Sequence, residues 1–81
     1  MYYSVELFGL LLRRHRENKR LSREYLAELC DISDRCISNI ERGKSDPKLS
    51  TVLKLCSKCD IDVGKLSELK VEEVYSQTVK M

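Results

Sequence analysis

Polar side chains with hydrogen-bond donors and acceptors gather on one side of a predicted helix at about residues 33–42. They are Asp34, Arg35, Ser38 and Asn39. Ile37 and Ile40 recur at helical spacing among them and are expected to face the core. Folding does not need the polar side, so its groups are available for binding. They do not indicate catalysis, because the sequence offers no Ser/His/Asp set, phosphate loop or paired carboxylates, and we expect no enzymatic activity.

Basic side chains form two runs on either side of this region, although the net charge is only +2. The first run is Arg13, Arg14, Arg16, Lys19, Arg20 and Arg23, with only Glu17 opposing it. The second is Arg42, Lys44 and Lys48, with Glu41 and Asp46 interspersed. A single run of this kind is most often a solvated helix face. Two runs that flank the same segment favour a polyanionic partner.

Four cysteines, Cys30, Cys36, Cys56 and Cys59, raise the question of a metal or redox site. The pair in "CSKC" lies within an apolar periodic segment, however, and the other two also fall at apolar positions. A buried cysteine behaves as a small hydrophobic residue. No second CxxC with zinc-ribbon spacing is present, and no βαβ pattern surrounds the pair. We therefore expect core thiols, with no metal and no cofactor.

The length of 81 residues allows one domain with a single small core. Charged residues make up 35% and hydrophobic residues 42% of the chain, which is typical of a globular protein. The N-terminal apolar run is interrupted by Glu6, is followed by basic residues and lacks a cleavage site. It is thus expected to be neither a signal peptide nor a membrane span. Reduced thiols in the cytoplasm are the corresponding expectation.

Hydrophobic periodicity and capping residues predict an all-α fold. Five helices are expected, at residues 5–18, 23–30, 33–42, 50–59 and 62–69. Ser4, Ser22 and Ser33 are candidates to cap the first three, and Gly43 is suited to end the third. Residues 1–69 form the predicted domain. Residues 70–81 form a short C-terminal tail that is either a further element used against another chain or a frayed end.

Residues 22–41 have the spacing of a helix-turn-helix. Ala27 is small enough to let two helices cross closely, and Asp31 falls in the turn between them. In such a motif the second helix is held so that its N-terminal residues can enter a major groove.

The sequence resembles the phage repressor/Cro (XRE-type) helix-turn-helix proteins over about residues 8–69. The motifs that carry the resemblance are "FGLLLRRHR", "LSREYLAELCDIS", "ISNIERGKSDP" and "LSTVLKLCSKCDIDVGKL". A helix-turn-helix pattern alone is weakly specific, but here matched segments precede and follow it. The resemblance implies a five-helix, lambda-repressor-like DNA-binding domain.

The resemblance also implies roles for individual residues. Base edges in the major groove would be approached by Asp34, Arg35, Ser38 and Asn39. Backbone phosphates would be held by Ser22, Arg23 and Ser33, with charge added by Arg42, Lys44 and Lys48. Arg16 and Glu41 match a pair that forms a salt bridge, which is a structural role. Arg35 and Asn39 are the first candidates for base contacts, because arginine can bind guanine O6 and N7 and asparagine can bind adenine N6 and N7.

Three residues depart from the family pattern. Arg23 stands where glutamine is usual, and it keeps phosphate binding possible. Asp31 replaces the usual glycine of the turn, but aspartate tolerates a positive φ better than most residues do. Asp34 places a carboxylate near phosphates. It could accept a hydrogen bond from cytosine N4, orient Arg35, or cap the start of the helix.

We therefore expect the protein to be a sequence-specific transcriptional regulator, namely a repressor that occupies a double-stranded DNA operator. A homodimer is expected, because such proteins commonly bind two-fold related half-sites. The alternative is a protein-interaction module on the same fold, such as an antitoxin or a regulator subunit. Its signature would be a loss of basic residues around the second helix of the motif, and Arg23, Arg35, Arg42 and Lys44 argue against that loss.

Overall fold

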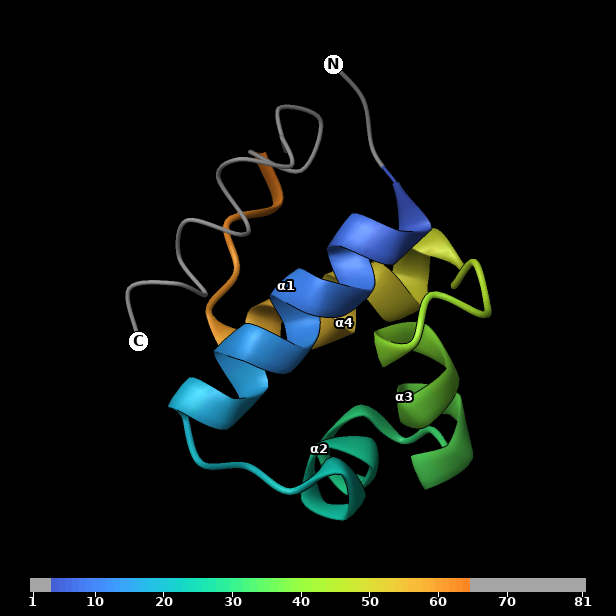
Figure 1. Ribbon diagram of the computed structural model, residues 1–81. Coiled ribbons are helices and arrows are strands. Elements are labelled where there is room, and N and C mark those ends of the chain that lie inside the picture. The colour runs from blue at the N-terminus through green and yellow to red at the C-terminus, as the bar shows by residue number, and fades with distance from the viewer. Residues whose placement is uncertain (1–3, 65–81) are drawn as a thin grey trace.

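The computed structural model describes residues 4–64, which form four α-helices and contain no strand within that range (Figure 1). The helices are α1 (Val5–Asn18), α2 (Arg23–Cys30), α3 (Asp34–Glu41) and α4 (Leu49–Cys59). These bounds confirm the first four predicted helices to within about a residue at each end. Residues 63–64 form a short 3₁₀ turn. The rest of the predicted fifth helix, the boundary at residue 69 and the tail 70–81 lie outside the described residues.

The first three helices begin at a serine whose hydroxyl accepts a hydrogen bond from a backbone N–H of the first turn. Ser4 accepts from Leu7, Ser22 from Tyr25 and Ser33 from Cys36, at 3.3, 3.0 and 3.0 Å. Each bond satisfies a donor that has no partner within its own helix. The three serine caps predicted from the sequence are therefore present.

All four helices end in the same way, with a residue of positive φ just beyond the helix. These residues are Arg20, Asp31, Gly43 and Asp60, at φ values of 58°, 56°, 70° and 59°. The residue that follows donates its backbone N–H to a carbonyl five positions earlier, which is the Schellman pattern. Only Gly43 is a glycine, so three ends hold a side chain in the left-handed region.

We expect Asp31→Gly to raise the free energy of unfolding by about 0.5–1 kcal/mol. Glycine removes the steric cost of the left-handed conformation, and it also removes a negative charge from the negative end of the α2 dipole. Urea unfolding followed by circular dichroism measures the change. Glu28→Gly, in the helical part of α2, is the control and should lose about 1 kcal/mol. A loss of stability for Asp31→Gly would contradict the prediction.

The core lies where the four helices meet. Its fully buried side chains are Phe8, Leu12, Leu26, Ile37, Ile40, Leu55, Cys30, Cys56 and Cys59. Helix α1 packs on α3 and α4, and α2 packs on the same two helices. None of the helices between residues 4 and 64 is long and apolar enough to cross a membrane.

The cysteines lie in this core or against it. Cys30, Cys56 and Cys59 are buried, and Cys36 is half-buried. Burial raises the pKa of Cys59 to about 11 and also raises the pKa of Cys30 and of Cys56. A thiol must lose its proton to bind a metal or attack a disulfide. These three side chains therefore stay neutral at physiological pH and serve as packing groups.

At Gly9 the backbone of α1 lies close against the end of α3. A Cβ atom at this position would overlap the carbonyl oxygen of Ile40 and would lie 2.9 Å from that of Glu41. Both obstacles are backbone atoms at the end of α3, which cannot rotate away. The absence of a side chain at Gly9 thus sets how closely the two helices pack.

Candidate nucleic-acid interface

Helices α2 and α3 form a helix-turn-helix at one end of the molecule, away from the termini of the described chain (Figure 1). The turn between them is closed by Ile32, whose N–H donates to the carbonyl of Ala27 at 3.0 Å. Asp31 adopts the left-handed conformation that the sequence required of it, with φ 56° and ψ 45°. Ala27 is buried, as expected of the small residue at the crossing. The motif therefore fixes the direction of α3 relative to the core.

The side of α3 opposite the core carries the predicted base-contacting residues. Asp34 and Arg35 are exposed, while Ser38 and Asn39 are half-buried. Within residues 4–64 the side chain of Arg35 has no hydrogen bond or ion pair. The guanidinium of Arg35 is thus available to a ligand, with no internal partner to displace.

Asn39 differs from Arg35 in having a partner. Its Oδ1 accepts a hydrogen bond from Nη2 of Arg42 at 3.3 Å. The two residues are three positions apart, at the end of α3, where side chains at that spacing are neighbours.

The predicted phosphate-contacting residues are all exposed: Ser22, Arg23, Ser33, Arg42, Lys44 and Lys48. The hydroxyl oxygens of Ser22 and Ser33 accept from their helices, which leaves their O–H groups able to donate outward. Arg23 and Arg42 form no ion pair with any residue of the described chain. The positive charges of Arg23 and Arg42 are therefore not neutralised by a carboxylate of the described chain, and an anionic partner could bind them.

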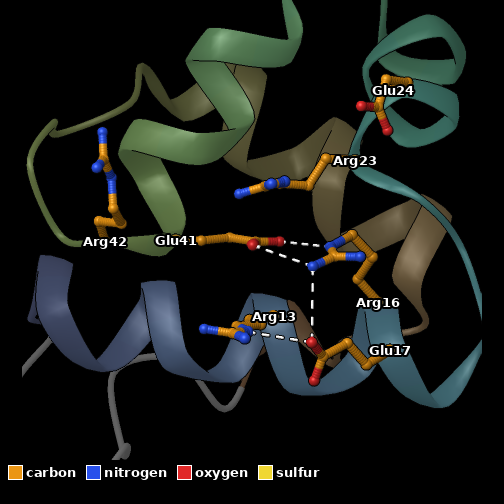
Figure 2. A pocket seen from close by; sticks show the side chains of 7 residues that line it. All are labelled: Arg13, Arg16, Glu17, Arg23, Glu24, Glu41 and Arg42. Atoms are coloured by element: carbon orange, nitrogen blue, oxygen red, sulfur yellow. Dashed lines mark hydrogen bonds and ion pairs between the residues drawn. The ribbon is translucent and has the colours of Figure 1, made fainter.

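A charged pocket of about 390 Å³ lies between α1, the start of α2 and the end of α3 (Figure 2). It is lined by Arg13, Arg16, Glu17, Arg23, Glu24, Glu41 and Arg42. In Figure 2 the side chains of Arg13 and Arg23 point toward the side of the pocket on which Arg42 lies. The sequence placed Arg13 and Arg23 in one basic run and Arg42 in the other, but gave no reason to bring the three side chains together. That grouping depends on how α1 crosses the motif.

An ion pair between Arg16 and Glu41 forms the back of this pocket (Figure 2). Arg16 donates from Nε to Oε2 of Glu41 at 2.6 Å and from Nη2 to Oε1 at 3.2 Å. Its Nη1 donates to the carbonyl of Leu21 at 2.7 Å. The two side chains are only 11% and 4% exposed.

The hydrogen bond with Glu41 raises the pKa of Arg16, so its charge is permanent. A doubly bonded, buried pair of this kind ties α1 to the end of α3 and to the loop before α2. Its role is to hold the motif in place. Of the other cations of the pocket, Arg13 pairs with Glu17 at 3.1 Å, whereas Arg23 and Arg42 have no ion pair with the described residues.

The side chains on this surface are suited to binding a ligand through hydrogen bonds and charge. Within residues 4–64, no three His, Cys, Asp or Glu side chains are grouped so that they could hold a metal ion. The exposed groups are hydrogen-bonding side chains on α3, with cations on either side of it. Such a surface suits a ligand with polar edges between two lines of negative charge.

Comparisons with known proteins agree with this geometry. The family model of the helix-turn-helix proteins matches residues 12–66. The restriction-modification controller protein C.AhdI from Aeromonas hydrophila is 35% identical, with a TM-score of 0.70 over 76% of this chain and 94% of its own. The clp gene regulator ClgR from Corynebacterium glutamicum shares the fold at 24% identity, with a TM-score of 0.74 over 94% of this chain and 78% of its own.

No curated protein matches the sequence. The family model nevertheless covers most of the chain. C.AhdI is 35% identical to this chain, and the match covers nearly the whole length of C.AhdI. The chain therefore belongs to the XRE-type helix-turn-helix family and is a DNA-binding regulator of transcription.

Proposed function

We propose that this protein is a cytoplasmic repressor that binds a DNA operator as a homodimer, with α3 of each copy in the major groove. The observation that carries the proposal is the exposed Arg35, which has no hydrogen bond or ion pair with residues 4–64 and lies four residues before Asn39 on α3. Arginine and asparagine are the side chains best suited to guanine and adenine edges. Occupying an operator in this way excludes the polymerase.

The surrounding residues would position α3 in the groove. Ser22 and Ser33 lie at the starts of α2 and α3, where free backbone amides and the helix dipole favour a phosphate. Arg23, Arg42, Lys44 and Lys48 would add charge-assisted contacts that carry no sequence information. Asp34 and Ser38 would complete the set that faces the bases.

The spacing of Arg35 and Asn39 makes a geometric prediction. Four residues of helix span about 6 Å, and successive base pairs are about 3.4 Å apart. If α3 lies along the groove, the two side chains read positions about two base pairs apart. A homodimer would repeat this reading in a second, two-fold related half-site about one helical turn away.

We expect Arg35→Ala to weaken binding to the preferred operator by about 1–3 kcal/mol and to relax base preference at one position in each half-site. The measurement is selection of random-sequence duplexes followed by sequencing, carried out for both proteins at two salt concentrations. Lys54→Ala, which removes an exposed cation from α4, is the control and should leave the selected motif unchanged. The wild-type affinity should fall steeply with salt.

A palindromic motif from the wild-type protein would support both the base reading and the homodimer. An enriched motif that stays the same in Arg35→Ala would exclude this side chain from base reading. Weak binding with no enriched motif would overturn the proposal. It would then favour a partner protein for this surface.

A further inference from the structure

We propose that Arg42 is a positioning residue that fixes the orientation of the Asn39 side-chain amide and thereby sets which base Asn39 reads. The inference rests on the proposed function, because it concerns a base contact of α3. It goes beyond that function by giving Arg42 a role in specificity as well as in charge.

The contact itself joins Nη2 of Arg42 to Oδ1 of Asn39 at 3.3 Å. It is the hydrogen bond that the structure gives the Arg42 side chain, which forms no ion pair with residues 4–64. The guanidinium is therefore not drawn away by a carboxylate, even though the nearby pocket contains three glutamates.

The backbones of both residues are held in place. The N–H of Arg42 donates to the carbonyl of Ser38 at 3.1 Å, and the N–H of Lys44 donates to that of Asn39 at 2.9 Å. Gly43, between Arg42 and Lys44, has φ 70° and closes the end of α3. Because Arg42 and Asn39 belong to one locked turn, their side chains stay within reach of each other.

An asparagine amide can present its oxygen and nitrogen in either order, and rotation by 180° exchanges them. With Oδ1 directed toward Arg42, Nδ2 lies on the opposite side. The oxygen keeps a second lone pair, so the amide still offers an acceptor and a donor side by side. Adenine offers the complementary pair, N6–H and N7, whereas guanine offers two acceptors. Arg42 thus fixes which side of the Asn39 amide is the acceptor and which is the donor, and with it the one orientation in which the amide can pair with adenine.

The experiment compares base preferences for four proteins on the same duplex library: wild type, Asn39→Ala, Arg42→Ala and Lys44→Ala. Asn39→Ala identifies the base pair that Asn39 reads. Lys44→Ala is the matched control, because it removes a neighbouring exposed cation whose side chain has no hydrogen bond with Asn39 and keeps the backbone bond between the two residues. We expect Arg42→Ala to lower the preference for adenine at that base pair by about two- to tenfold, the value of one hydrogen bond. Lys44→Ala should weaken all sequences equally.

A second measurement needs no DNA. The side-chain amide resonances of Asn39 should shift in Arg42→Ala and stay in place in Lys44→Ala. Adding Arg42→Ala to Asn39→Ala should change the preference at that base pair no further, since the amide on which Arg42 acts is gone.

Three results would overturn the inference. A uniform loss of affinity in Arg42→Ala, with the base preference and the Asn39 resonances unchanged, would leave Arg42 as a charge alone while the proposed function stands. A wild-type preference for a base other than adenine at the pair found with Asn39→Ala would refute the fixed orientation. The absence of any motif for the wild-type protein would remove the proposed function and this inference together.

Discussion

Glu41→Ala is expected to lower the free energy of unfolding by about 3–5 kcal/mol, which is the cost of breaking a buried ion pair from one side. The substitution removes both acceptors of the Arg16 fork and leaves a guanidinium that is 11% exposed with only the exposed Glu17, 3.9 Å from its Nη2, as a counter-charge. A guanidinium keeps its proton over the whole pH range in which proteins fold, so Arg16 cannot become neutral to avoid this cost. The free energy of unfolding of a small domain is itself small, so this variant should lose most of its stability.

Urea unfolding followed by circular dichroism at 222 nm measures this loss. The double variant Arg16→Met/Glu41→Leu is the informative control. Replacing both members of a buried pair with apolar groups of similar volume strands no charge and is often neutral or stabilising. We expect it to recover most of the stability. A double variant as unstable as Glu41→Ala would show that the packing of these two positions matters more than their charge.

Gly9→Ala is expected to lower the free energy of unfolding by about 3 kcal/mol, at the upper end of the cost of overpacking. Alanine favours a helix over glycine by about 1 kcal/mol, so local propensity predicts the opposite sign. The tertiary clash decides the outcome, because the new Cβ would meet the carbonyl oxygens of Ile40 and Glu41. Helix α1 would have to move away from α3.

The same unfolding measurement applies to Gly9→Ala, with Asn18→Ala as the control. Asn18 is exposed at the end of α1, so its replacement tests helix propensity without the clash and should be neutral or slightly stabilising. If Gly9→Ala were stabilising too, the approach of α1 to α3 would not limit the packing. The displacement of α1 should also disturb the Arg16–Glu41 pair, so the effects of Gly9→Ala and Glu41→Ala are expected to be less than additive.

The local part of this structure could be predicted from the sequence. The serines at positions 4, 22 and 33 mark helix starts because a hydroxyl needs only the amide three residues ahead. Asp31 could be expected to have a positive φ only through the family resemblance, because glycine is usual at this position of the turn. The burial of Cys56 and Cys59 follows from their place in an apolar stripe.

The candidate interface was predictable only as a set of positions. Periodicity places Arg35 and Asn39 on one side of α3, but it gives neither the partner of a side chain nor its rotamer. Arg42 lies three residues from Asn39, and the sequence still indicated only a phosphate contact. The hydrogen bond between them depends on Arg42 being free of every carboxylate near it.

The sequence by itself determined the four described helices, the serine caps of the first three and the glycine that ends α3, because each of these depends on residues within about one helical turn of one another. The helix-turn-helix followed from the spacing of these helices and from the family resemblance. The tertiary structure alone decided how closely α1 approaches α3 at Gly9, how deeply Arg16 and Glu41 are buried, and which arginines share a pocket. These features join residues up to 32 positions apart, from Gly9 to Glu41. They follow from the crossing of whole helices, which is fixed by the packing of the entire core and not by any local pattern.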